Sequence, residues 1–431
     1  MIGGIQNITK IPELKKKIWF SLAMLAVYRI GVHIPSPGID PVALSAFFKR
    51  AQGTLFGLFD MFSGGALENM SVFALGIMPY ISASIILDLL TVVIPYLDKL
   101  KKEGEAGRKK ITQYARYGTV VLSLFQGFGI AVGMENMAGP DGLSVVIHPG
   151  WGFRLMTMIT LTSGTAFIMW LGEQITERGI GNGISLIIFA GIVARMPTAL
   201  TNTWQLVRTG EMNLVFAFFL IVLMIAVIGV IVFVERGQRR IPVQYAKRVV
   251  GRKMYGGQST YLPLRINMAG VIPVIFASAI LVFPVTLAQM TPWSWAQSAA
   301  KAVGPGTGMY LVAEVLLIIA FTYFYTAVQF NPVDQADNLR KYGGYVPGIR
   351  PGPPTAQYLD RVLTRLTLPG ALFLALVAVL PSIFIRYAGF SQSTSRALGG
   401  TSVLIVVGVA LDTMRQMEAQ MMMRNYEGFL R

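Results

Sequence analysis

The sequence predicts an all-α integral membrane protein with ten transmembrane helices, from its long apolar stretches, its few charges and its hydropathy. Charged residues make up 13% of the 431 residues, against about 25% in a soluble domain, and the mean hydropathy is +0.57. Roughly 20 apolar residues cover a ~30 Å hydrocarbon core as a helix. The predicted spans are residues 18–34, 71–95, 114–134, 153–172, 183–203, 214–234, 266–290, 310–330, 366–386 and 399–417.

The basic residues predict the orientation of these spans. Most of the 37 lysines and arginines lie at the two termini and in the loops on one side of the spans, whereas the opposite loops carry few. By the positive-inside rule, the basic side and both termini are cytoplasmic. This bias also explains most of the net charge of +16 without nucleic-acid binding.

The ten spans divide into two sets of five at the loop 204–213. An odd number of spans in each half forces the halves into opposite orientations, the setting for inverted repeats around a central site. No residue-level repeat accompanies this symmetry. The N-terminal half is 18–203 and the C-terminal half is 214–417, with cytoplasmic segments at 1–17 and 418–431.

Three cytoplasmic loops are long, and each has its own pattern. Residues 96–113 are charged and are expected to be helical at their edges. Residues 235–265 place Ile241, Val243 and Tyr245 in alternation with polar residues, and Gly256-Gly257 offers a turn, so a protruding β-ribbon is expected. Residues 331–365 are rich in Gly and Pro, which predicts a rigid, irregular tip between two helical shoulders.

One apolar segment, 55–67, is too short to span a membrane. It precedes the second span on the outer side and contains Ser63-Gly64-Gly65. Non-helical backbone at membrane depth must be surrounded by protein or water, as in a movable stopper inside a cavity. A static helix on the outer surface explains the composition equally well.

Catalytic chemistry has little support. The two histidines, His33 and His148, lie far apart, cysteine is absent, and no Walker-type phosphate loop occurs. We therefore expect no enzyme, no cofactor and no metal site. The sequence also offers no Ser/His pair or metal-binding group of the kind that an intramembrane protease needs.

The alternative function is secondary transport of a small solute or lipid, and the small number of acidic residues within the spans argues against it. Such a carrier needs ionisable groups near mid-membrane. Asp88, Glu314 and Asp412 lie in three different spans, and no two acids share a span at helical spacing. The long basic loops also argue against a carrier, because a carrier has no need of them.

Two spans combine small, helix-bending and aliphatic residues, in GIMPYISAS (76–84) and NMAGVIPVI (267–275). Small residues allow close helix approach, and proline bends a helix. The pattern fits ordinary packing. It also fits two kinked helices that line a cavity closed by an isoleucine constriction, which excludes ions by dewetting.

Seven stretches resemble the SecY family, the central subunits of bacterial protein-conducting channels, and they follow the family's order. They are ALGIMPYISASIILDLL (74–90), KKEGEAGRKKITQYARYG (101–118), WLGEQITERGIGNGISLIIFAGIV (170–193), VERGQRRIPVQYAKR (234–248), LPLRINMAGVIPVIFAS (262–278), NPVDQADNLRKYGGYVPGIRPG (331–352) and GGTSVLIVV (399–407).

The resemblance implies a clamshell of two inverted five-helix halves around an hourglass pore. The family's ring of aliphatic pore residues falls on Ile77, Ile81, Ile184, Ile188, Ile275 and Ile405. Segment 55–67 resembles the family's short plug helix, with Phe59, Met61, Phe62, Gly64 and Gly65 as plug residues.

The resemblance also implies a lateral gate and a docking surface. The second and seventh spans match the gate, with Ser82 and Asn267 at polar positions where a hydrogen bond between the helices would hold it closed. Docking of the ribosome and of the SecA ATPase is expected at Arg239, Arg240, Lys247, Arg248 and Arg350, because guanidinium groups suit phosphate and acidic surfaces.

The implied function is a passive, gated channel in the bacterial plasma membrane that passes preproteins bearing signal peptides and releases membrane helices into lipid. SecE and SecG are the expected companion subunits. Two positions depart from the family. Asp88 stands where relatives carry a neutral residue, and Pro353-Pro354 follows the tip where a charge is common.

Overall fold

The computed structural model of the protein describes most of the chain. The described residues are 11–40, 43–44, 63–135, 144–210, 213–245, 248–250, 253–255, 259–290, 298, 302, 304, 307–388 and 400–429.

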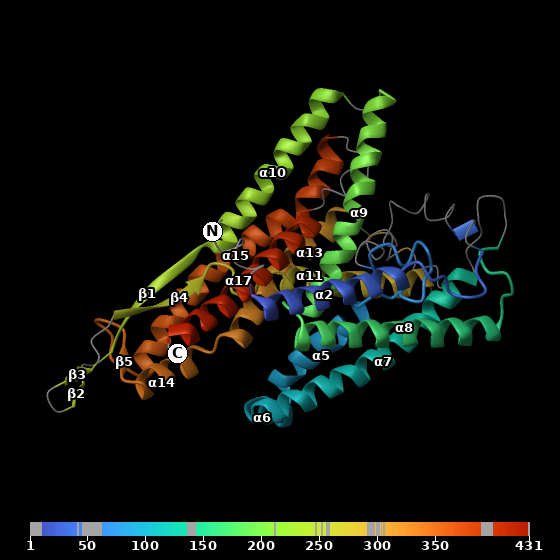
Figure 1. The fold of residues 1–431 in the computed structure, drawn as a ribbon. Coiled ribbons are helices and arrows are strands. Elements are labelled where there is room, and N and C mark those ends of the chain that lie inside the picture. Colours follow the sequence, from blue (N-terminus) through green and yellow to red (C-terminus); the bar gives the residue numbers. More distant parts are fainter. Residues whose placement is uncertain are drawn as a thin grey trace.

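Each of the ten predicted spans coincides with a helix (Figure 1). In the N-terminal half the helices are α2 (Pro12–Gly31), α5 (Met78–Val93), α6 (Pro95–Lys102), α7 (Glu105–Glu135), α8 (Trp151–Arg178) and α9 (Gly183–Arg208). In the C-terminal half they are α10 (Leu214–Arg236), α11 (Ile272–Met290), α13 (Gly308–Gln329), α14 (Pro332–Lys341), α15 (Pro353–Ala388) and α17 (Gly400–Phe429).

The length and hydropathy of these helices fit a multi-pass membrane protein. Within the described residues, six helices are long and apolar enough to cross a membrane by themselves, and a seventh is counted if α5 and α6 form one span bent by 101°. The bend follows Ile94, which is extended and is succeeded by Pro95. A residue before proline is driven out of the helical region, which explains the bend.

The second and seventh spans begin later than the sequence predicts. Residues 71–77 form turns before α5 starts at Met78, and residues 266–271 precede α11. Gly270 has a φ of +63°, a conformation that cannot continue a right-handed helix and that glycine adopts without strain. Pro79 and Pro273 then fall in the first turn of their helices, where a missing N–H costs nothing.

The two halves meet along several helix pairs. In Figure 1, α2, α5, α7 and α8 (blue to green) lie beside α11, α13, α15 and α17 (yellow to red). Helix α11 packs against α5 and α7, and α17 packs against α9. Helices α9 and α10 form a long hairpin that extends from the bundle (Figure 1). The connection between them is shorter than the loop expected at 204–213, because α9 continues to Arg208.

The predicted β-ribbon is confirmed. Strand β1 (Gln238–Tyr245) pairs antiparallel with β4 (Ser259–Arg265), and β2 (Arg248–Val250) pairs with β3 (Lys253–Tyr255) beyond them. Ile241 and Val243 are buried as their alternation predicts. At the far end of this pair Val250 faces Lys253, and the turn predicted at Gly256-Gly257 lies outside the described residues.

The third long loop, residues 331–365, contributes a strand to the same sheet as the ribbon. Strand β5 (Gly344–Tyr345) pairs with β1, giving the order β4-β1-β5. Helices α14 and α15 form the two predicted shoulders of this loop. Pro353-Pro354 opens α15, a position where proline's fixed φ favours the helix.

Candidate functional site

The six isoleucines of the expected pore ring converge on one apolar cluster. Ile77 and Ile81 lie at the start of α5, Ile184 and Ile188 at the start of α9, Ile275 on α11 and Ile405 on α17. Five of them are buried members of the cluster, and Ile184 packs against it partly buried.

The spacing within two of these helices explains the convergence. Residues four apart lie on one face of a helix, so Ile77 and Ile81 point the same way, as do Ile184 and Ile188. The exposed fractions of Ile188 and Ile405 are only 2% and 0%. These buried aliphatic side chains offer no polar group that could replace the hydration shell of an ion.

The C-terminal end of the predicted plug is attached to two helices. The Tyr28 hydroxyl of α2 donates to the Ser63 carbonyl at 2.9 Å, and Arg29 Nη1 donates to the Gly64 carbonyl at 2.9 Å. From α9, Arg195 forms an ion pair with Glu68 at 2.7 Å. Sequence reasoning missed these contacts. Phe59, Met61 and Phe62 lie outside the described residues.

Gly64 and Gly191 make the closest approach between this segment and α9. Gly64 has a φ of +68°, and a Cβ atom built on it would lie 2.7 Å from the Gly191 Cα. Gly65 has a φ of +91°, but its Cβ would meet only Arg195 Nε at 3.9 Å. Both positions favour glycine by conformation, and only Gly64 also needs it for space.

We expect Gly64→Ala to lower the melting temperature of the detergent-purified protein more than Gly65→Ala does. The positive φ costs an alanine about 1–2 kcal/mol at either position. The overlap with the Gly191 backbone adds roughly 1–3 kcal/mol at Gly64 alone. Equal melting temperatures for the two variants would contradict the close packing of Gly64 on α9.

The two expected gate residues are not bonded to each other. Ser82 is half-buried on α5, and Asn267 is buried just before α11. Asn267 Nδ2 donates to Glu235 Oε1 at 2.6 Å and to the Gly270 carbonyl at 3.0 Å, while its Oδ1 accepts no hydrogen bond from the described residues. The predicted contact across the helices is therefore replaced by one within the C-terminal half.

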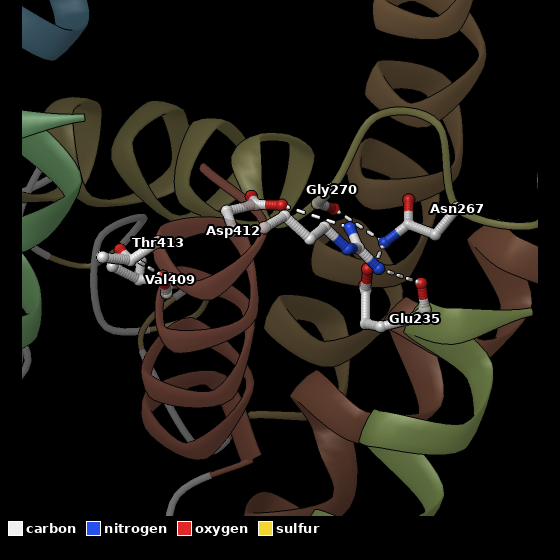
Figure 2. A network of polar contacts seen from close by, with 7 residues as sticks. Glu235, Asn267, Gly270, Val409, Asp412 and Thr413 are labelled. Carbon is white, nitrogen blue, oxygen red and sulfur yellow. Dashed lines mark hydrogen bonds and ion pairs between the residues drawn. The ribbon is translucent and has the colours of Figure 1, made fainter. Parts of the chain in front are cut away.

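Glu235 is a residue of this region that sequence reasoning missed (Figure 2). It is buried at the end of α10, and its backbone carbonyl accepts a hydrogen bond from Arg415 Nη2 of α17 at 2.7 Å. Arg415 Nη1 also contacts Asp412 Oδ1 at 3.2 Å. The sequence signal was a lone acidic residue at the end of the most apolar span.

The expected docking arginines lie on the β4-β1-β5 sheet and its neighbouring tip. Arg239 and Arg240 are exposed on β1, and Arg350 is exposed after β5. The Arg350 carbonyl accepts a hydrogen bond from the buried Thr355 hydroxyl at 2.8 Å, which fixes the tip to α15. Arg248 lies on β2 with its side chain outside the described part, and Lys247 lies outside it altogether.

The three acids within the predicted spans lie on three different helices. Asp88 is on α5, Glu314 on α13 and Asp412 on α17, where Asp412 pairs with Arg415. Among the described residues, no three or more His, Cys, Asp or Glu side chains are grouped so as to hold a metal ion.

Comparisons with known proteins agree with this arrangement. The SecY family model matches residues 71–414. The protein translocase subunit SecY of Escherichia coli K12 is 52% identical over 425 residues, covering 98% of this chain and 95% of the relative. The SecY subunit of Thermus thermophilus is 50% identical over 434 residues, covering 100% of this chain and 98% of the relative.

Solved structures share the fold. A structure described as a protein conducting channel matches with a TM-score of 0.65 at 17% identity, covering 94% of this chain and 91% of the other. A structure in a study of the plug domain of the SecY protein matches with a TM-score of 0.61 at 18% identity, over the same shares. The all-α, multi-pass membrane fold is thus confirmed, and the chain belongs to the SecY family.

Proposed function

We propose that the chain is the channel-forming subunit of a Sec protein translocase in the bacterial plasma membrane. It passes unfolded preproteins across the membrane and releases membrane helices sideways into lipid. The observation that carries the proposal is the convergence of the six ring isoleucines, from helices of both halves, on one buried apolar cluster. The 52% identity to a translocase subunit over nearly the whole chain supports it.

The ring serves as the seal of the resting channel. Aliphatic side chains exclude hydrated ions, because no polar group replaces the lost water. They also bind no passing sequence tightly, since dispersion contacts are weak and non-directional. A polypeptide segment can therefore displace them, and they close again behind it.

The plug and the gate complete the opening mechanism. The end of the plug segment at Ser63–Gly65 stays attached to α2 through Tyr28 and Arg29, and Gly64 lies against Gly191 of α9. Parting α5 from α11 opens a path to lipid for signal peptides and membrane helices. The loop at 204–213 joins the two halves as a hinge.

The chain performs no bond chemistry and depends on partners for energy. The SecA ATPase or the translating ribosome docks on Arg239, Arg240, Lys247, Arg248 and Arg350 from the cytoplasm, where both termini also lie. SecE and SecG accompany the chain in the membrane. Guanidinium groups suit these partners because they form bidentate bonds with RNA phosphates and with carboxylates.

The test is reconstitution of the chain with SecE into liposomes, with SecA, ATP and a preprotein carrying a signal peptide. We expect the preprotein to become protected from external protease only with ATP and only with its signal. Without protection, while a control translocon is active in parallel, the proposal fails and small-solute transport becomes the leading alternative.

A further inference from the structure

The basic ribbon joins the helix bundle at one polar junction (Figure 2). Glu235 lies in the last turn of α10, just before β1, and Asn267 follows β4 just before α11. Between them, the Ile266 amide donates to the Gly237 carbonyl at 3.0 Å and closes the base of the ribbon. A displacement of the ribbon therefore reaches Glu235 and Asn267 first.

A strong hydrogen bond crosses this junction. Asn267 Nδ2 lies 2.6 Å from Glu235 Oε1, and the exposed fractions of the two residues are 3% and 6%. A bond to a carboxylate in such a dry site is stronger than a neutral bond in water. It holds the turn that begins α11 against the end of α10.

Arg415 adds a third helix to the junction. Its Nη2 donates to the Glu235 carbonyl at 2.7 Å, where a cation complements the carbonyls at the end of α10. The guanidinium also brings positive charge close to the buried carboxylate. Helices α10, α11 and α17 are thus tied together by side chains at one point.

One buried hydrogen-bond acceptor of this junction has no partner among the described residues. Asn267 Oδ1 is buried and accepts no hydrogen bond from the part of the chain that the structure describes. An unpaired buried acceptor is costly. Another position of α11 that offers Oδ1 a donor would recover this cost, as expected for an element with two discrete arrangements.

We propose that Glu235 is a positioning residue that links the docking ribbon to the gate. Through Asn267 it holds α11 in the closed position, and movement of the ribbon on partner docking breaks this contact. Because α11 packs against α5 and carries Ile275, its release shifts the gate and the ring together. The inference rests on the proposed channel function and names the residues that connect its docking surface to its gate.

The first test measures channel openings in planar bilayers, with the chain assembled with SecE and with no SecA or ribosome present. Glu235→Ala removes the acceptor of Asn267, and we expect openings about tenfold more frequent than in the parent. Glu235→Gln keeps a carbonyl acceptor at the same place and is expected to give a smaller increase. Glu135→Gln weakens a partly buried ion pair with Arg154 between α7 and α8, away from this junction, and serves as the control, with unchanged openings.

A second readout separates positioning from mere structural support. In liposomes with SecA and ATP, Glu235→Ala is expected to import a preprotein that lacks its signal peptide, which the parent rejects. Loss of a purely structural contact would lower yield or melting temperature without relaxing this requirement. If the parent imports signal-bearing preprotein but Glu235→Ala opens no more often than the parent, the inference is overturned and the proposed channel function is not.

The outcomes keep the inference and the channel function apart. A parent chain that imports no preprotein would overturn the proposed function instead. If Glu235→Ala does not assemble with SecE, Asn267→Ala removes the other partner of the same bond and is measured in its place. Openings equal to those of the parent in that variant would equally overturn the inference.

Discussion

Replacing Ile81, Ile188, Ile275 and Ile405 together with glycine will make the resting channel conduct ions. These side chains lie in one buried cluster and come from α5, α9, α11 and α17. Burial of each contributes about 1.5–3 kcal/mol, so their loss removes several kcal/mol from the closed constriction. We expect the resting conductance in planar bilayers to rise by at least about a hundredfold, since ~1.4 kcal/mol is a factor of ten.

The same four positions provide the control. Leucine conserves volume and apolar character, and such exchanges usually cost less than about 1.5 kcal/mol. The four-leucine variant is therefore expected to stay closed and to import preprotein. A glycine variant that assembles with SecE and conducts no more than the parent would show that these residues do not form the seal.

The helices and the ribbon could be predicted because their signals are local. Apolar stretches of helical length defined the ten spans, and the alternation of Ile241 and Val243 defined β1. The boundaries failed where single residues act on the backbone, as at Gly270 before α11.

The contacts that connect distant segments could not be predicted. Nothing in the sequence pairs Glu235 with Asn267, or Arg29 with the Gly64 carbonyl, because these bonds depend on how whole helices pack. The addition of β5 to β1 was missed because a strand of two residues carries no periodicity. The ring residues were assigned by family resemblance, and physical reasoning alone suggested only an isoleucine constriction.

Replacing Arg350 with glutamate will reduce SecA-driven import by about tenfold or more, while the complex with SecE still assembles. Arg350 is exposed, and its backbone is fixed by the hydrogen bond from Thr355 to its carbonyl. The substitution leaves that backbone bond in place and reverses only the charge of the side chain. A hydrogen bond to a charged group contributes about 1.5–3 kcal/mol, which corresponds to roughly a ten- to hundredfold effect.

Two further variants make the Arg350 experiment specific. Arg361→Glu reverses an exposed charge on α15 and is expected to leave import near the parent rate. Arg350→Lys keeps the charge but loses the planar fork that binds carboxylates bidentately, so its import rate should fall between those of the parent and Arg350→Glu. Because the position of Arg350 is set by buried neighbours rather than by its own side chain, a normal import rate for Arg350→Glu would mean that SecA does not contact this tip.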